Sequence, residues 1–197
     1  MITTRDQEVI KFIEKFKVAK TSTLTELFYP STRVAQRRLA KIVEHRLLNR
    51  SRAYVSTEYM YYINRKPKQL RHKLILSNFY GELSKMFSLI GFNVEQTFSD
   101  LRADGFAGFK LNKDDDTSFL AFIEVEISNN KFNTEKYKKF LYTQEYKTCG
   151  LDTFPQIIAI TNKKIDECED LEIIQIKEDL SDVEVLKDYY CKNNRNR

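Results

Sequence analysis

The chain has 197 residues, of which 42% are hydrophobic and only 5 are Gly and 3 Pro, a composition typical of a folded protein and not of a disordered one. Its apolar runs are too short to span a bilayer, and its first residues lack the charged-then-apolar order of a signal peptide, so we expect a cytoplasmic protein without a membrane partner. The net charge of +5 conceals a strong asymmetry along the chain.

The basic residues are concentrated in the first third of the sequence. Residues 1–73 carry 17 Lys and Arg against 6 Asp and Glu, whereas the remainder carries 16 against 22. A basic module joined to an acidic one predicts a nucleic-acid-binding part attached to a part with another role. The three cysteines, Cys149, Cys168 and Cys191, are odd in number and lack metal-ligand spacing, which favours reduced thiols.

Three helices are predicted at the start of the chain. Thr4 to Gln7 fits a capping box, and apolar residues then recur at helical spacing to Phe16. After a polar break, a short helix covers Thr23 to about Phe28, and a third runs from Ser31 to about Arg46. The third helix is amphipathic. Its apolar face is Val34, Ala35, Leu39, Ile42, Val43 and Leu47, and its polar face carries Arg33, Gln36, Arg37 and Lys41.

A β-hairpin is predicted next, with strands over 48–54 and 59–63. Three helices and a hairpin within residues 1–66 follow the plan of a winged helix-turn-helix domain, whose third helix enters the major groove of double-stranded DNA. We therefore expect the polar face of the third helix to meet DNA, and Arg50 and Arg52 on the hairpin to contact phosphates. The alternative is that the third helix is an ordinary amphipathic helix whose polar face is solvated and binds no DNA.

A second domain is predicted over residues 70–178, after a basic, proline-containing junction at 65–69, with a C-terminal helix and tail over 179–197. Its elements are a helix over 71–89 ended by Gly91, strands over 92–98, 101–109 and 119–128, a helix over 135–146, strands over 155–161 and 171–177, and a helix over 183–190 with a frayed tail. The expected fold class is α+β and α/β: the winged helix-turn-helix, then a mixed sheet with flanking helices.

Acidic residues stand out on the two central strands of this second part. Asp104 precedes Gly105 on the first, and Glu124 and Glu126 lie on the second, where alternation gives them the same face. If the strands pair, three carboxylates converge. Like charges held close repel unless a cation or a proton stands between them, so we expect either a raised pKa in at least one of the acids or a bound Mg²⁺ or Mn²⁺.

The order helix, three strands, helix, two strands, with these acids on its central strands, resembles the core of the PD-(D/E)XK nuclease superfamily. The resemblance implies that Asp104 and Glu124 hold Mg²⁺ or Mn²⁺ and that Glu126 takes the place of the usual catalytic lysine. That departure can be offset by a lysine from the next helix, for which Lys136 is the candidate, with Lys131 behind it. Glu82 could add an acid, although an exposed helix glutamate is the more common reading.

A wider resemblance rests on the order of short motifs from Thr3 to Tyr137. They are Thr3-Thr-Arg-Asp6, Leu27-Phe-Tyr-Pro-Ser31, Arg33-Val-Ala-Gln-Arg-Arg-Leu39, Leu70-Arg-His-Lys-Leu74, Asp104-Gly105 and Ile123-Glu-Val-Glu-Ile-Ser-Asn-Asn130. Together they resemble the replication-relaxation family of plasmid and mobile-element proteins. The resemblance implies a protein that binds double-stranded DNA in replication initiation or in DNA relaxation and processing.

Three functional hypotheses stay open at this point. The first is the mobile-element DNA-binding protein just described. The second is a transcriptional regulator whose nuclease-like domain is inactive and serves in homodimerisation or partner binding, which the missing strand lysine favours. The third is a metal-dependent endonuclease or nickase targeted by the winged helix. The sequence offers no Tyr or His cluster of a relaxase, so a separate relaxase or replication protein is an expected partner.

Overall fold

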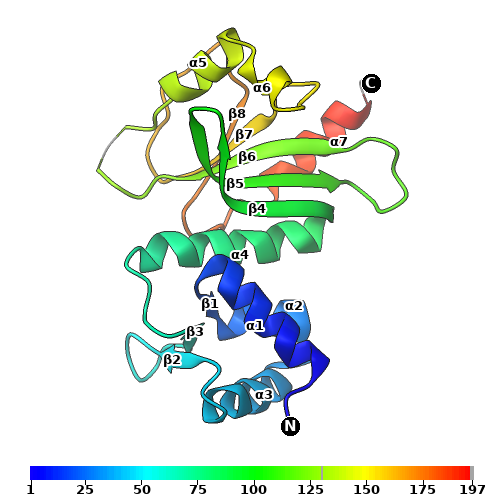
Figure 1. The fold of residues 1–197 in the computed structure, drawn as a ribbon. Coiled ribbons are helices and arrows are strands. Elements are labelled where there is room, and N and C mark those ends of the chain that lie inside the picture. Colours follow the sequence, from blue (N-terminus) through cyan, green and yellow to red (C-terminus); the bar gives the residue numbers. More distant parts are fainter. Residues whose placement is uncertain (130, 196–197) are drawn as a thin grey trace. The chain divides into compact units, whose positions relative to one another are not determined.

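The computed structural model describes residues 1–129 and 131–195 and divides into two compact units, Met1–Gly81 and Glu82–Arg197 (Figure 1). The fold is mixed α+β: helices with a small antiparallel sheet come first, and a five-stranded mixed sheet with flanking helices follows. The division falls inside helix α4, Leu70–Met86, beyond the basic segment 65–69. Residues 74–81 carry no charged side chain, so the first unit holds all 17 Lys and Arg and all 6 Asp and Glu of the basic third.

The first unit contains three helices and three short strands. They are α1 (Thr4–Phe16), β1 (Ala19–Lys20), α2 (Thr21–Phe28), α3 (Thr32–Glu44), β2 (Asn49–Ser51) and β3 (Met60–Tyr62), and the beginning of α4 completes the unit. The strands form an antiparallel sheet in the order β1-β3-β2. Strand β1 replaces part of the predicted polar break, because the fully buried Ala19 pairs with Tyr61.

Two local predictions in this unit need correction. The capping box of α1 is formed by Thr3 and Asp6, one residue earlier than expected, with each side chain bonded to the backbone of the other. Helix α3 ends at Glu44, so Leu47 lies past its apolar face and is 42% exposed. Of the rest of that face, Ala35, Leu39 and Ile42 are buried, and Val34 and Val43 are half-buried.

The second unit is built on a sheet with the strand order β4-β5-β6-β7-β8. Its elements after α4 are β4 (Ser88–Phe98), β5 (Leu101–Lys110), β6 (Phe119–Val125), α5 (Glu135–Tyr142), α6 (Glu145–Thr148), β7 (Gln156–Ile160), β8 (Ile173–Ile176) and α7 (Val185–Arg195). Strands β4, β5 and β6 are antiparallel neighbours, and β6, β7 and β8 run parallel. The order of helices and strands agrees with the prediction.

Helices cover both faces of this sheet. On one side of β6, Phe122 packs against Tyr137 of α5, with ring centroids 5.4 Å apart. Phe119, three residues away and so on the other side, packs against Tyr190 of α7 at 4.9 Å. The burial of these rings fixes the register of the central strands, because a slip by one residue would exchange the two faces.

Several predicted boundaries in the second unit are wrong. Helix α4 ends at Met86, and Gly91 lies inside β4 at a shift of register instead of ending the helix. The predicted helix over 135–146 is interrupted at Gln144, whose φ of 54° is left-handed. Helix α7 continues to Arg195, where a frayed tail was expected. Strand β6 ends at Val125, which leaves Glu126 beyond the strand.

The three cysteines are free thiols, as expected. No helix in the part of the chain that the structure describes is both long and apolar enough to cross a membrane.

Candidate nucleic-acid interface and carboxylate site

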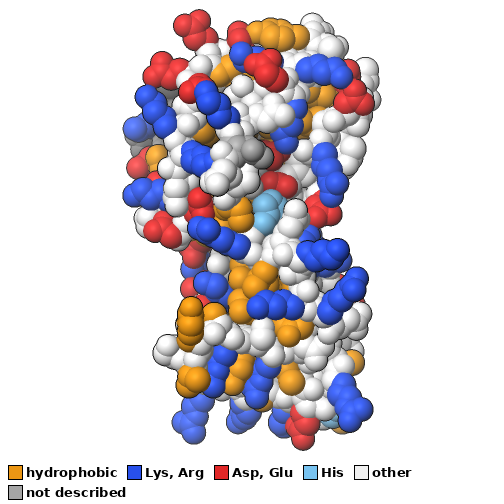
Figure 2. Space-filling model, turned by 90° about the vertical axis from the view of Figure 1, so that its left-hand side faces the viewer, with side chains coloured by type: hydrophobic (Ala, Val, Ile, Leu, Met, Phe, Trp, Pro, Cys, Tyr) orange, Lys and Arg blue, Asp and Glu red, His pale blue; other side chains and the backbone are white. Residues whose placement is uncertain are grey.

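The polar face of α3 is open to solvent. Its members Arg33, Gln36, Arg37 and Lys41 are all exposed, whereas the opposite side of the helix is buried in the first unit. Figure 2 shows Lys and Arg side chains predominating among the charged side chains of the first unit on the face that it presents. The structure therefore presents the four predicted side chains together on one surface.

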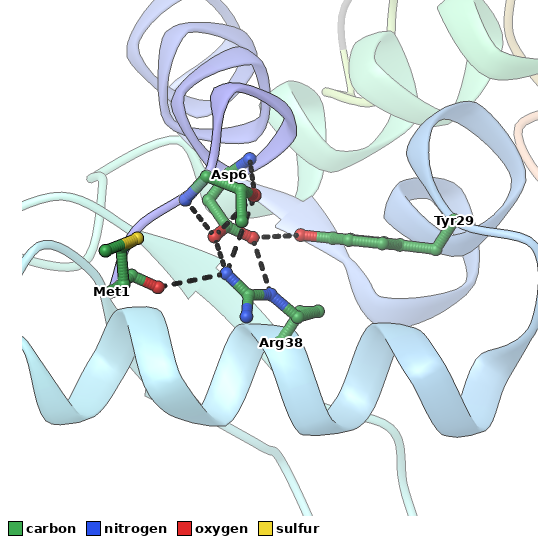
Figure 3. Close-up of polar contacts among 5 residues, drawn as sticks. Met1, Asp6, Tyr29 and Arg38 are labelled. Atoms are coloured by element: carbon green, nitrogen blue, oxygen red, sulfur yellow. Dashed lines mark hydrogen bonds and ion pairs between the residues drawn. The ribbon is translucent and has the colours of Figure 1, made fainter.

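A buried carboxylate determines how α3 is attached to the rest of the unit (Figure 3). The side chain of Asp6 in α1 is fully buried. Its Oδ1 accepts hydrogen bonds from Arg38 Nε at 3.1 Å and from the Tyr29 hydroxyl at 3.2 Å, and its Oδ2 forms an ion pair with the Arg38 guanidinium. The backbone N–H and the hydroxyl of Thr3 also donate to Oδ2, each at 2.8 Å.

This cluster joins the start of α1, the residue that follows α2 and the middle of α3 around one charge. Burial on its own would raise the pKa of Asp6, but hydrogen bonds from Arg38 and Thr3 and the charge of Arg38 lower it to about 2. Burial, together with the adjacent Asp6, raises the pKa of the Tyr29 hydroxyl, which stays a donor. Asp6 is thus held ionised inside the protein.

Sequence reasoning missed Arg38, although a signal was present. Arg38 lies three residues after Ala35 and four before Ile42, so helical spacing places it beside the apolar face of α3 and not among the exposed arginines. An arginine at such a position needs a buried acid as its partner. Asp6 is this buried acid. Its role in the capping box gave no indication that it also pairs with Arg38.

The hairpin arginines are held against an aromatic ring. The guanidinium of Arg50 lies 4.4 Å from the centre of the Tyr59 ring, and that of Arg52 lies 5.0 Å from it. Both arginines are exposed, and Arg52 follows the end of β2. Stacking on one ring restricts the two side chains before any ligand arrives, which lowers the entropic cost of binding a phosphate.

The second candidate site lies where β5 and β6 pair. The register that pairs Gly105 with Ile123 places Asp104 opposite Glu124. Asp104 Oδ2 accepts a hydrogen bond from the backbone N–H of Val125 at 2.9 Å, which fixes this carboxylate at the end of β6. The Glu124 side chain is only 12% exposed.

Two side chains from α5 contact Glu124. Lys136 Nζ donates to Glu124 Oε1 at 2.6 Å and to the carbonyl oxygen of Arg102 at 3.0 Å. The hydroxyl of the fully buried Tyr137 donates to the same Oε1. Burial and the nearby charge of Asp104 raise the pKa of Glu124 to about 7, although Lys136 and Tyr137 act in the opposite direction. Tyr137 was not singled out from the sequence, and only its position beside Lys136 pointed to it.

Glu126 does not join this pair. Its backbone N–H continues the pairing of β6 by donating to the carbonyl of Ile160 at 3.0 Å, but its carboxylate turns to the next loop and accepts from the N–H of Ser128 at 2.8 Å and from the Ser128 hydroxyl. Within residues 1–129 and 131–195, no group of three or more His, Cys, Asp or Glu is placed to hold a metal ion. The expected convergence of three carboxylates is therefore wrong, because the strand and its alternation end before Glu126.

The remaining expected site residues lie in other pairings. Glu82 forms an ion pair with Lys85 in α4 at 3.1 Å. Lys131 pairs with Asp166 at 3.3 Å, and both side chains are exposed. Asn130, the last residue of the longest motif, lies outside the described residues.

The pair Asp104 and Glu124 nevertheless suits a divalent cation of the Mg²⁺ type. Mg²⁺ keeps several waters and is usually held by one or two carboxylates together with phosphate oxygens, so it does not require a cage of protein ligands. The pKa of Glu124 is raised mainly by burial and then by the charge of Asp104, and Lys136 offsets these two effects only in part. A further cation would be electrostatically favoured there.

Comparisons of the chain with protein-family models, with curated proteins and with solved structures gave no match in any of the three.

Proposed function

We propose that this chain is a double-stranded-DNA-binding protein of a bacterial plasmid or mobile element that acts in replication initiation or DNA relaxation. One observation carries the DNA-binding part: an exposed face of α3 with three cationic side chains and a glutamine, in a unit with 17 Lys and Arg against 6 Asp and Glu. In this proposal the unit is a winged helix-turn-helix, α3 is the recognition helix and the β2–β3 hairpin is the wing. The plasmid or mobile-element setting rests on the motif resemblance alone.

The proposed division of labour follows from side-chain chemistry. Arg33, Gln36 and Arg37 lie in the first half of α3, where arginine can bond two atoms of a guanine edge and glutamine two atoms of an adenine edge. Arg50 and Arg52, held by Tyr59, supply phosphate contacts that act alike on every sequence. The Asp6 cluster keeps α3 in place but contacts no base.

Substitution of the two classes of arginine should separate base reading from phosphate contact. Arg37→Ala should lose about 1–3 kcal/mol of discrimination between preferred and other sequences. Arg52→Ala should weaken all duplexes alike and reduce the slope of log K against log salt by about 0.9. Binding titrations over a salt series on selected and scrambled duplexes measure both effects. Lys131→Ala, in an exposed surface pair, is the control. A full-length chain that binds no duplex at low salt would exclude the proposal.

A second candidate function is supported by the site of the second unit. The order α4, β4, β5, β6, α5, β7 follows the PD-(D/E)XK pattern, and Lys136 contacts Glu124 beside Asp104. In this proposal Asp104 and Glu124 would hold Mg²⁺ or Mn²⁺, and Lys136 would attract the phosphate in place of the usual strand lysine. The metal, when bound, lowers the pKa of water and neutralises phosphate charge, as cleavage of a phosphodiester needs.

The alternative is a nuclease-like unit that does not cut and serves instead in dimerisation or partner binding in a transcriptional regulator. The position of Glu126 favours it, because this residue lies beyond the end of β6 and its Oε1 accepts hydrogen bonds from Ser128. Supercoiled plasmid incubated with the protein and Mg²⁺ or Mn²⁺ distinguishes the two: nicking indicates an enzyme, and a gel shift without nicking indicates a binding protein.

A further inference from the structure

The loop between β2 and β3 ends in two exposed apolar side chains. Tyr54 is 74% exposed and Val55 is 81% exposed. Among the large hydrophobic side chains of the described residues, only that of Met1 is more exposed. Single exposed apolar residues are common on proteins, but two adjacent ones at the tip of a hairpin form a distinct projecting surface.

The tip is a fixed turn. Thr57 donates its backbone N–H and its hydroxyl to the carbonyl of Tyr54, at 3.0 and 2.8 Å, and the N–H of Tyr54 donates back to the Thr57 hydroxyl at 3.1 Å. Arg52 donates to the carbonyl of Val55 at 2.8 Å. These bonds hold the backbone of the turn in one conformation. The side chains of Tyr54 and Val55 project from this turn into solvent.

Cations flank this tip. Arg52 lies two residues before the tip, and Arg52 and Arg50 both stack on Tyr59, which lies two residues after it. The intervening Glu58 is paired with Lys20 and Ser22. The tip belongs to the basic unit, with 17 Lys and Arg against 6 Asp and Glu, which favours a polyanion as its partner. The DNA minor groove matches it, since phosphates line both edges of the groove and apolar side chains can enter between base steps at its floor.

We propose that the wing tip, residues 54–57, enters the minor groove and that Tyr54 and Val55 wedge between two base pairs and bend the duplex. This inference rests on the proposed function, since it takes duplex DNA as the ligand of the first unit. It goes beyond that function because contact with phosphates alone would place no side chain between base pairs. The cost of unstacking is lowest at pyrimidine–purine steps, so such a step is the expected position of the wedge.

The test uses the full chain and duplexes of about 30 base pairs that contain TA steps, a length that resolves bending of a protein site. Energy transfer between dyes on the two ends reports bending, and 2-aminopurine in the TA steps reports unstacking. The wild type should raise both signals on binding. The double variant Tyr54→Ala/Val55→Ser should still bind at low salt, about tenfold more weakly, with both signals near those of free DNA.

Two controls make the outcome specific. Tyr142→Ala removes a tyrosine of similar exposure, 63%, from the second unit and should behave as the wild type. The melting temperature of the double variant should be unchanged, because both side chains are exposed. Wild-type binding without a change in either signal would overturn the wedge and leave DNA binding intact. A wild type that binds no duplex would overturn both proposals, which separates the two failures.

Discussion

Arg38→Ala is expected to lower the free energy of unfolding of the first unit by about 3 kcal/mol, the low end of the cost of removing one partner of a buried ion pair, because Asp6 is fully buried but Arg38 is 18% exposed. The substitution would leave the carboxylate of Asp6 fully buried with bonds only from Thr3 and Tyr29. Arg37→Ala is the matched control, because the neighbouring side chain is exposed and its loss should change stability by less than about 0.5 kcal/mol. Urea unfolding of both variants measures the difference, and equal midpoints would contradict the assigned role of the Asp6 cluster.

The same cluster predicts a loss of stability in acid. The pKa of Asp6 is about 2 in the folded chain against an ordinary value of 3.8. A carboxyl with a lowered pKa contributes stability above its unfolded pKa and loses it as pH falls through the folded one. The contribution is about 2–3 kcal/mol by that linkage, fully present above pH 4–5 and lost progressively toward pH 2. The free energy of unfolding of Asp6→Asn should not show this loss in acid, which unfolding measured from pH 7 to pH 2 checks.

Loss of the Asp6 cluster should also weaken binding at the proposed DNA interface. Arg38 and Arg37 are adjacent on α3, but only Arg37 points to solvent. Arg38→Ala should therefore weaken binding to all duplexes as the unit unfolds or α3 loses its position, whereas Arg37→Ala should change sequence preference in a stable protein. Substitution of Arg38 thus tests the stability of the first unit, and substitution of Arg37 tests the proposed DNA recognition.

Periodicity was sufficient for the parts of the fold that depend on local patterns. The spacing of Leu39 and Ile42 predicted helix α3 and its buried face, and therefore also which residues lie on the exposed face opposite. The order of the elements likewise placed Lys136 on the helix after β6, from which it contacts Glu124. These predictions succeed because one apolar stripe or one alternating strand is decided by its own sequence.

The parts that failed depend on contacts between distant segments. Nothing near Asp6 in the sequence indicates that Arg38, in another helix, is its partner. The sequence of Glu124 to Glu126 continues the strand pattern, and only the course of the chain after Val125 turns Glu126 toward Ser128. Tyr137 reads as an ordinary core residue, because burial of its ring gives no indication that its hydroxyl bonds to Glu124.

Glu124→Gln is expected to have the opposite effect to Asp6→Asn. The pKa of Glu124 is raised to about 7 in the folded chain, above its ordinary 4.5. A carboxyl of this kind is more easily ionised in the unfolded chain, so stability falls as pH rises from about 4.5 to 7 and stays low above it. Glutamine keeps an acceptor for Lys136 and Tyr137 but removes the cost of burying a charge and the repulsion with Asp104. The variant should gain about 1–3 kcal/mol at pH 8.

Metal binding supplies the second half of this prediction. Mn²⁺ at the Asp104–Glu124 pair stabilises only the folded chain, so a concentration of about 100 times the Kd should add about 2.7 kcal/mol to the wild type and raise its melting temperature. Glu124→Gln should start higher and show no such rise. Glu82→Gln, which removes a carboxylate paired with Lys85 on α4, is the control and should keep the wild-type rise. If the wild type and Glu124→Gln melt alike with and without Mn²⁺, the two acids share no metal site. A rise in melting temperature without plasmid nicking would assign the site to metal binding and not to cleavage.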